Sequence, residues 1–352
     1  MFDLYRNLGR TGVRVSPLTL GCMNFGWKTG LDDSCALIDR ALEAGINFLD
    51  TANVYGDGAS EDVVGEALSR NGHRDFVYLA TKCHGNVFKE KDGDDDATKL
   101  RKKLNPNKWG NSRRMVMDSA EASLRRLRTD RIDLYQIHRP HPDCAIDETL
   151  RALDDLVSQG KVRSIGCSTF AAYQLVASLW TSERLGLDRF VTEQPPYHLL
   201  DRRIERELLP ACTQFGLGVI PWSPLAGGYL TGKYRGGDAG GGGRIKPGSN
   251  GRNDTLLQSD AAAAVVDKLV ELSEAKGCSP SQLALAWVVH QPGVTSPIIG
   301  PRTVEQLDDN LGAVSVEVAD EDRAAFDELV PPGTCVVPYY EAAFEAPPRG
   351  AG

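Results

Sequence analysis

Four residues of this 352-residue chain, Asp50, Tyr55, Lys82 and His138, carry side chains that together could perform acid catalysis. A tyrosine phenol has an ordinary pKa of about 10 and is a poor proton donor at neutral pH. A nearby lysine ammonium would lower that pKa, and a carboxylate paired with the lysine would keep it charged and fix its direction. A histidine could orient a carbonyl oxygen or relay a proton. This combination predicts a general acid directed at an oxygen that becomes an alkoxide, as in carbonyl reduction.

Each of the four residues also has an ordinary structural explanation. Taken alone, Asp50 could cap a helix, Tyr55 could be a packed aromatic residue, and His138 could be a core histidine with its hydrogen bonds satisfied. Lys82 is harder to explain in this way, because burying an ammonium without a partner is costly. A shared active site is therefore favoured only because all four coincide with the predicted ends of strands or the loops beside them.

The elements that would position these residues follow from an alternation of short β-branched or aromatic runs with segments of helical period. We expect strands at 18–21, 46–50, 76–81, 132–138, 162–167, 190–194, 217–221 and 296–299. We expect helices at 32–44, 61–68, 112–128, 147–159, 172–184, 202–215, 281–290 and 303–311. Eight strand–helix units predict an α/β fold of the TIM (β/α)8-barrel type rather than an open sheet.

Active sites of such barrels lie at the carboxyl ends of the strands. Asp50 and His138 end predicted strands, Lys82 directly follows one, and Tyr55 lies five residues beyond Asp50. Other polar or aromatic residues fall at the remaining strand ends: Ser168, Thr169, Gln194, Trp222, Ser223 and Arg302. We therefore expect these side chains to converge on one mouth of the barrel.

We interpret residues 1–352 as a single barrel domain with four segments outside the alternation. Turn residues between apolar positions in 1–16 predict an N-terminal hairpin that closes the bottom of the barrel. The others are a charged inserted loop at 84–111, a glycine-rich loop at 225–253 and a C-terminal tail at 331–352. These long loops and the tail would lie at the C-terminal face and shape the substrate site. Their aromatic candidates, with the loop at 23–30, are Phe25, Trp27, Phe88, Trp109, Tyr339 and Tyr340.

Composition argues against several other classes of protein. A net charge of −8 disfavours a nucleic acid or an anionic membrane as the main partner. No apolar run approaches the roughly 18 residues that span a bilayer, and no signal peptide is visible. The eight cysteines contain no C-x-x-C pair, which indicates reduced thiols in a cytoplasmic enzyme. The six histidines form no zinc motif, so no metal site is expected.

Several stretches resemble the aldo-keto reductase superfamily, in its NADPH-dependent, bacterial-type members. They are LDTANVYG (49–56), ATK (80–82), DLYQIH (133–138), GCSTF (166–170), EQPPY (193–197), PWSPLAGG (221–228) and IGPRT (299–303). They occur in the family's order between Gly21 and Asn310 and so cover most of the chain. The resemblance implies a barrel that binds NADPH or NADP⁺ and reduces an aldehyde or ketone.

The resemblance also implies a role for each matching residue. Tyr55 would donate the proton, Lys82 and Asp50 would tune the acidity of Tyr55, and His138 would hold the carbonyl oxygen. The cofactor would be held at the carboxamide by Ser168 and Gln194, at the nicotinamide ring by Trp222, at the pyrophosphate by Ser223, Leu225, Gly227 and Lys233, and at the adenosine end by Gly300, Arg302, Gln306 and Asn310. Pairing of the Arg302 guanidinium with a 2′-phosphate would favour NADPH over NADH.

The chain departs from the family pattern at three places. Thr169 stands where asparagine is common, which would alter one cofactor hydrogen bond. Gly300 and Pro301 stand where some branches have lysine and serine. The inserted segment lengthens the separation between Lys82 and His138.

Two alternatives to a carbonyl reductase with a small-molecule substrate stay open. The chain could be a non-catalytic NADPH-binding accessory or sensor subunit, although the complete tetrad disfavours this. It could also be a barrel lyase or isomerase that uses Lys82 covalently. The substrate, the physiological direction of the reaction and the presence of a homo-oligomer cannot be predicted from these residues.

Overall fold

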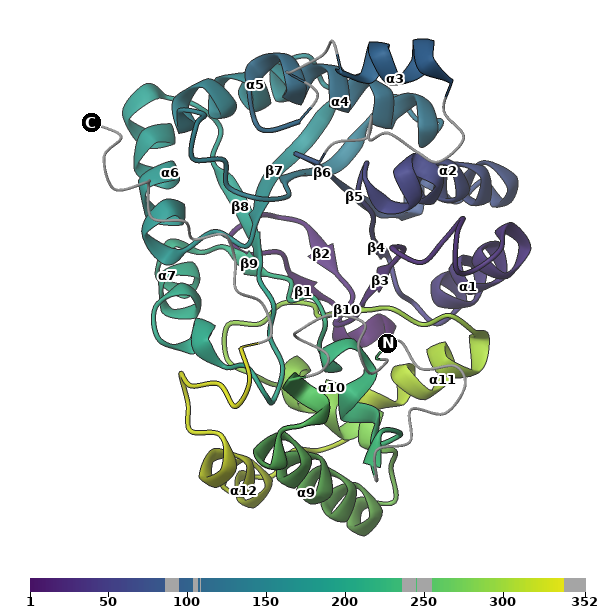
Figure 1. Cartoon of the computed structure of the whole chain (residues 1–352), viewed down its shortest axis with the longest axis vertical. Helices are drawn as coiled ribbons and strands as arrows, with labels where there is room; N and C mark the ends of the chain where they lie inside the picture. The colour runs from purple at the N-terminus through teal and green to yellow at the C-terminus, as the bar shows by residue number, and fades with distance from the viewer. Residues whose placement is uncertain (86–94, 104–106, 108, 236–244, 246–254, 339–352) are drawn as a thin grey trace. The chain divides into compact units, whose positions relative to one another are not determined.

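The structure, a computed structural model, describes residues 1–85, 95–103, 107, 109–235, 245 and 255–338 (Figure 1). Parts of the predicted loops at 84–111 and 225–253 and of the tail lie outside this range. So do Phe88, Tyr339 and Tyr340, three of the aromatic residues expected around the substrate. The chain divides into two compact units, unit 1 (residues 1–19, 41–46 and 193–352) and unit 2 (residues 20–40 and 47–192). A single domain therefore stays a prediction.

Eight parallel strands alternate with helices along the chain, which confirms the predicted α/β fold of the TIM-barrel type. They are β3 (Thr19–Gly21), β4 (Phe48–Asp50), β5 (Tyr78–Cys83), β6 (Ile132–Ile137), β7 (Val162–Ser168), β8 (Phe190–Gln194), β9 (Gly218–Val219) and β10 (Ile298–Ile299). Their order in the sheet is β10-β3-β4-β5-β6-β7-β8-β9. Each strand lies within or close to a predicted range. Within unit 1, Val219 of β9 also bridges to Val294, just before β10.

The N-terminal hairpin is confirmed as an antiparallel pair of β1 (Arg6–Asn7) and β2 (Arg14–Val15). Its turn contains Gly9 in a left-handed conformation, with φ of 57°. A Cβ atom at this position would lie 2.5 Å from the backbone nitrogen of Gly218. Only glycine therefore allows the turn to pack against the first residue of β9 within unit 1.

The main helices of unit 2 match their predictions. They are α1 (Leu31–Glu43), α2 (Ala59–Asn71), α4 (Arg113–Arg126), α5 (Ile146–Ser158) and α6 (Ala172–Leu185). In α5, Leu150, Leu153 and Leu156 recur at the spacing of one helical face, and all three are fully buried. A further helix, α3 (Asp96–Lys103), lies within the segment predicted as an inserted loop and was not expected. Short 3-10 turns are η2 (Tyr55–Gly58) and η3 (Arg74–Phe76).

Unit 1 contains helices that the sequence analysis missed. It comprises α7 (Leu208–Phe215), α9 (Asp260–Lys276), α10 (Pro280–Val289), α11 (Val304–Gly312) and α12 (Asp320–Leu329), with 3-10 turns η1 (Phe2–Leu4), η4 (Arg203–Glu205), η5 (Ala226–Thr231) and η7 (Ala313–Ser315). Neither α9 nor α12 was predicted. The helix predicted at 202–215 begins only at Leu208. Before it the chain forms η4, where the Arg202 guanidinium binds Glu205 and Asp327 and holds this turn.

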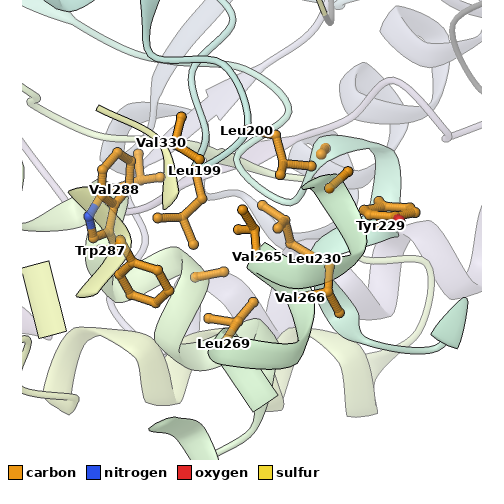
Figure 2. Close-up of a cluster of buried hydrophobic side chains, with 14 of the residues drawn as sticks. Leu199, Leu200, Tyr229, Leu230, Val265, Val266, Leu269, Trp287, Val288 and Val330 are labelled. Carbon is orange, nitrogen blue, oxygen red and sulfur yellow. The ribbon is translucent and has the colours of Figure 1, made fainter. Parts of the chain in front are cut away.

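The core of unit 1 is a cluster of apolar side chains between α9, α10 and the segment after β8 (Figure 2). Val265, Leu269 and Trp287 are at most 1% exposed and contribute its helical side. Leu199 and Leu200, in the segment after β8, contribute the opposite side of the cluster. Across the described part of the chain, no helix is both long and apolar enough to cross a membrane.

Candidate active site

The predicted Asp50–Lys82 pair is formed and sealed inside unit 2. Asp50 ends β4 and is paired in register with Ala80, two residues before Lys82, so both side chains lie on one face of the sheet. Lys82 Nζ donates to Asp50 Oδ2 at 2.5 Å and to the Thr51 carbonyl oxygen at 2.7 Å. The side chains are 0% and 4% exposed. A buried ammonium with these partners is held both charged and fixed in direction.

Tyr55 reaches this ion pair from the first residue of η2. Its hydroxyl oxygen accepts a hydrogen bond from Lys82 Nζ at 3.5 Å. Gly56 and Asp57 follow with φ of 57° and 56°, so the chain turns away from the site immediately after the tyrosine. Unlike Asp50 and Lys82, Tyr55 is only half-buried. It can therefore connect the sealed pair with a molecule outside.

His138 completes the group from the residue after β6. Its backbone nitrogen donates to the Cys83 carbonyl oxygen at 2.9 Å, which fixes it beside the end of β5. Its ring meets the Tyr55 ring edge to face, with centroids 5.6 Å apart and planes at 84°. His138 is half-buried, as Tyr55 is. The structure thus brings all four predicted catalytic side chains together within unit 2.

The net shift of the Tyr55 pKa differs from the expectation. Burial raises its pKa, the Lys82 ammonium lowers it, Asp50 raises it again, and the net direction is upward from the ordinary value. Lys82 lowers the pKa of the phenol, as predicted, but burial, which the sequence does not reveal, outweighs this effect. A raised pKa leaves the phenol protonated at neutral pH, which a proton donor requires.

The pKa values of Lys82 and His138 are shifted as well, in opposite directions. Burial lowers the pKa of Lys82, but attraction to Asp50 and Tyr55 outweighs burial and raises the pKa overall. Burial lowers the pKa of His138 well below its ordinary value, and the charges of Lys82 and Arg139 add to this. At neutral pH the site therefore combines an ammonium, a protonated phenol and a neutral imidazole. Such an imidazole can hold a carbonyl oxygen through its single N–H.

Of the predicted cofactor residues, only Ser168 belongs to unit 2. It ends β7 and is 1% exposed. Ile137 pairs in register with Cys167, so Ser168 and His138 are the next residues along two adjacent strands. Ser168 therefore lies at the same strand ends as the tetrad.

The remaining predicted cofactor residues belong to unit 1, where Gln194 is the last residue of β8 and Trp222 follows β9. Gln194 ends β8 and is 2% exposed. The Trp222 nitrogen donates to the Pro195 carbonyl oxygen at 2.9 Å, and Trp222 bridges to Pro196. The backbone of the half-buried Trp222 is thus fixed beside the end of β8.

The backbone is curled in the segment from Ser223 to Lys233, where the pyrophosphate contacts are predicted. Ser223, Ala226, Gly227 and Gly228 all have positive φ, and the half-buried Leu225 lies between them. A Cβ on Gly228 would lie 3.4 Å from Lys233 Nζ, so the ammonium lies over a backbone without a side chain. Curled backbone beside an ammonium fits a phosphate group.

The predicted adenosine end lies around the start of α11. Thr303 caps this helix, since its hydroxyl accepts from the Gln306 nitrogen at 3.3 Å. The Gln306 side-chain oxygen accepts from the Arg302 nitrogen at 2.9 Å, which fixes Arg302 at the helix N-terminus. Gly300 is exposed and Asn310 is buried. An arginine that directly precedes the cap of a helix is suited to bind a phosphate.

Comparison with known proteins identifies the family of this chain. The aldo/keto reductase family model matches residues 17–331. The chain belongs to the aldo/keto reductase family. It is 38% identical over 335 residues to the uncharacterised oxidoreductase YrpG of Bacillus subtilis (strain 168), covering 93% of this chain and 96% of that protein.

Two further relatives are named as a reductase and as a channel subunit. The versiconal hemiacetal acetate reductase of Aspergillus parasiticus is 33% identical, covering 92% of this chain and 96% of that protein. A probable voltage-gated potassium channel subunit beta of Oryza sativa subsp. japonica is 34% identical, covering 89% of this chain and 91% of that protein. This aldo/keto reductase is thus an oxidoreductase of a family that generally uses NAD(P)H on small-molecule carbonyl compounds.

One buried residue of this aldo/keto reductase site was missed by the sequence analysis. Gln136 pairs in register with Lys82, and its Nε2 donates to Asp50 Oδ1 at 3.2 Å. Gly166 provides the space, since a Cβ there would lie 3.3 Å from Gln136 Cγ. A polar residue in an otherwise apolar strand, two positions before His138 and therefore on the same face, was the available signal.

The departure from the family pattern at Thr169 coincides with unusual backbone geometry. Thr169 has φ of 58°, a left-handed conformation that asparagine tolerates and β-branched residues rarely adopt. Its hydroxyl donates to the Ser168 carbonyl oxygen at 2.7 Å and accepts from Arg139 Nη1 at 3.0 Å. These two bonds hold the threonine in place. No group of three or more potential metal-ligating side chains occurs in the part of the chain that the structure describes.

Proposed function

We propose that this oxidoreductase is NADPH-dependent and reduces an aldehyde or ketone to the alcohol, with the proton supplied by Tyr55. The observation that carries the proposal is the contact between the hydroxyl of the half-buried Tyr55 and Lys82, whose ammonium is sealed against Asp50. A structural tyrosine would not need a buried ion pair at its hydroxyl, because a buried charge is costly to maintain. A tyrosine that must release a proton gains from a buried ion pair, because the ammonium stabilises the phenolate.

The protein groups would act on the carbonyl oxygen. When bound, NADPH supplies a hydride for the carbonyl carbon, so the oxygen becomes basic. Tyr55 then gives its proton to that oxygen, and the Lys82 ammonium stabilises the phenolate that is left. The neutral His138 imidazole donates a hydrogen bond that holds the oxygen toward Tyr55. Asp50 keeps Lys82 charged throughout.

The cofactor roles are proposed residue by residue. Ser168 and Gln194 would bind the carboxamide, and Trp222 would stack on the nicotinamide ring. The remaining contacts would be to the pyrophosphate, from Ser223, Leu225, Gly227 and Lys233, and to the adenosine end, from Gly300, Arg302, Gln306 and Asn310. The preference for NADPH rests on the Arg302 guanidinium, which can bind a 2′-phosphate.

The eight free thiols support a cytoplasmic location.

The decisive experiment is Tyr55→Phe, which removes the hydroxyl and keeps the ring. NADPH binding, measured by fluorescence titration, should survive, while aldehyde reduction should fall by about two orders of magnitude or more. Tyr173→Phe is the matched control, because Tyr173 is 72% exposed on α6. Unchanged turnover of Tyr55→Phe would remove Tyr55 from the acid role.

A second candidate function is a non-catalytic NADPH-binding accessory or sensor subunit. The named channel subunit among the relatives favours it. The intact tetrad disfavours it, because a binding subunit has no need of a protonated phenol on a buried ion pair. Stoichiometric NADPH binding without consumption across a broad aldehyde panel would favour the accessory role.

A further inference from the structure

Three aromatic side chains of unit 2, His84, Trp109 and His141, form a cluster that the proposed mechanism leaves unused. We call this cluster the Trp109 platform. The Trp109 and His141 rings are stacked, with centroids 4.8 Å apart and planes at 25°. The His84 ring meets both edge to face, at 5.8 Å from Trp109 and 5.6 Å from His141. The indole is thus supported from two directions.

Hydrogen bonds anchor the platform to the ends of two strands. A His84 ring nitrogen, Nδ1, lies 2.9 Å from Asn111 Oδ1, and the Gly110 nitrogen donates to the His84 carbonyl oxygen at 2.8 Å. Asn111 Nδ2 in turn donates to the Arg139 carbonyl oxygen at 2.9 Å. The segment that carries Trp109 is therefore tied to residues that directly follow β5 and lie just beyond β6.

Two backbone features show that the platform is closely fitted. A Cβ on Gly110, whose φ is 101°, would lie 2.3 Å from His141 Cδ2, so only glycine allows this approach. His84 itself has φ of 147°, a conformation that residues with a side chain rarely adopt. Strained backbone of this kind costs roughly 1–3 kcal/mol and is typical of functional sites rather than of ordinary surface loops.

The platform borders the proposed proton donor. Cys83 and Ile137 pair in register, so His84 and His138 are the next residues on adjacent strands. On the other side, a Cβ on Gly85 would lie 2.1 Å from Cγ1 of Val54, the residue before Tyr55. The platform and the proposed proton donor therefore lie at the same strand ends, and the part of a substrate next to its carbonyl group could contact the platform.

We propose that the Trp109 platform is the specificity-determining surface of this site and selects carbonyl substrates that carry an aromatic ring next to the carbonyl. Trp109 remains 49% exposed although it is held in one position. A single exposed tryptophan needs no explanation, but one that is stacked, anchored and supported by a strained residue is preorganised to receive a partner. An aromatic ring stacks favourably on an indole beyond the gain from buried area. This inference rests on the proposed reductase function.

The test compares benzaldehyde with cyclohexanecarbaldehyde, which has a ring of similar size but no aromaticity. We measure kcat and KM with NADPH for the wild type, Trp109→Ala and Trp109→Phe. Trp109→Ala should lower the ratio of kcat/KM values, benzaldehyde over cyclohexanecarbaldehyde, by about three- to tenfold and mainly through KM. Trp109→Phe should retain most of the ratio. Trp180→Ala, which removes a 62% exposed tryptophan on α6, should leave it unchanged.

The outcomes separate the two proposals. If Trp109→Ala changes both aldehydes equally or neither, the platform does not select aromatic rings and this inference is overturned. If the wild type consumes NADPH with neither these aldehydes nor a broad panel, the proposed reductase function itself fails. A preserved ratio in Trp109→Phe together with a lost ratio in Trp109→Ala supports stacking.

Discussion

Gln136 and Lys82 hold the two oxygens of Asp50 separately: Gln136 Nε2 binds Oδ1 at 3.2 Å and Lys82 Nζ binds Oδ2 at 2.5 Å. A carboxylate held at both oxygens cannot rotate away from the lysine without breaking the second bond. The direction of the ammonium toward Tyr55 therefore depends on a residue that touches neither the phenol nor the proposed substrate. Gln136 is a positioning residue.

Replacing Gln136 should test this positioning. In Gln136→Leu the bond to the Asp50 carboxylate is lost, and a hydrogen bond to a charged group contributes roughly 1.5–3 kcal/mol. We expect kcat for aldehyde reduction to fall about tenfold or more while KM for NADPH stays within about twofold. Steady-state kinetics provide the measurement, and an unfolding curve checks that the variant is folded. A rise in KM with unchanged kcat would contradict the positioning role.

The sealed pair of Lys82 and Asp50 also predicts a large effect on stability. Lys82→Met leaves the Asp50 charge buried without its main partner, and the free energy of unfolding should fall by roughly 3–5 kcal/mol. The double variant Lys82→Met/Asp50→Leu should recover much of this loss, because no charge remains to be buried. Urea unfolding of the single and double variants provides the comparison.

An exposed ion pair supplies the control for that experiment. Lys161 Nζ lies 3.1 Å from Glu121, and these side chains are 33% and 50% exposed. Lys161→Met should cost less than about 1 kcal/mol, since surface pairs contribute little. If Lys82→Met lowered the free energy of unfolding no more than Lys161→Met does, Lys82 and Asp50 would not form the buried ion pair described here.

Much of this site could be predicted because it depends on strand ends and local spacing. The eight strands, the N-terminal hairpin and the grouping of Asp50 with Lys82 follow from patterns along the chain. The sequence could not decide the pKa of Tyr55, because the balance of burial against the lysine charge is known only once the fold packs the phenol. The contact between Trp109 and His141 could not be predicted from the sequence either, since it depends on where the segment before α4 returns to the strands.

The two missed helices had different causes. In α9 the buried residues Ala262, Val265, Val266 and Leu269 follow the helical spacing, so the sequence does contain the signal for this helix. In α12, Phe326 is the buried hydrophobic residue, so no apolar stripe marks the helix. Such a helix is stabilised by tertiary contacts that a pattern along the chain does not reveal.

His138 should make the fold sensitive to acid. Burial first, then the Lys82 and Arg139 charges, lowers the pKa of the folded imidazole well below that of the unfolded chain, which is about 6.5. Below that pH the unfolded chain binds a proton that the folded chain does not, so stability is fully present above about pH 6.5 and is lost as the pH falls.

The measurement compares wild type with His138→Asn by urea unfolding at pH 7.5 and pH 5. Burial also lowers the pKa of His84 and of His290, but both residues are present in each protein. The smaller acid-induced loss in the variant therefore isolates His138. Equal losses in the two proteins would show that folding does not lower the pKa of His138.

Thr169 offers a test of backbone strain beside the proposed cofactor site. Its left-handed φ of 58° should cost a β-branched residue on the order of 1 kcal/mol, and asparagine tolerates this conformation. We expect Thr169→Asn to raise the melting temperature by a few degrees. Thr169→Val, which keeps the branching and loses the hydroxyl bonds to Ser168 and Arg139, should lower it. Calorimetry of both variants distinguishes the two contributions: a loss in both would mean that the hydroxyl bonds, rather than strain, dominate at this position.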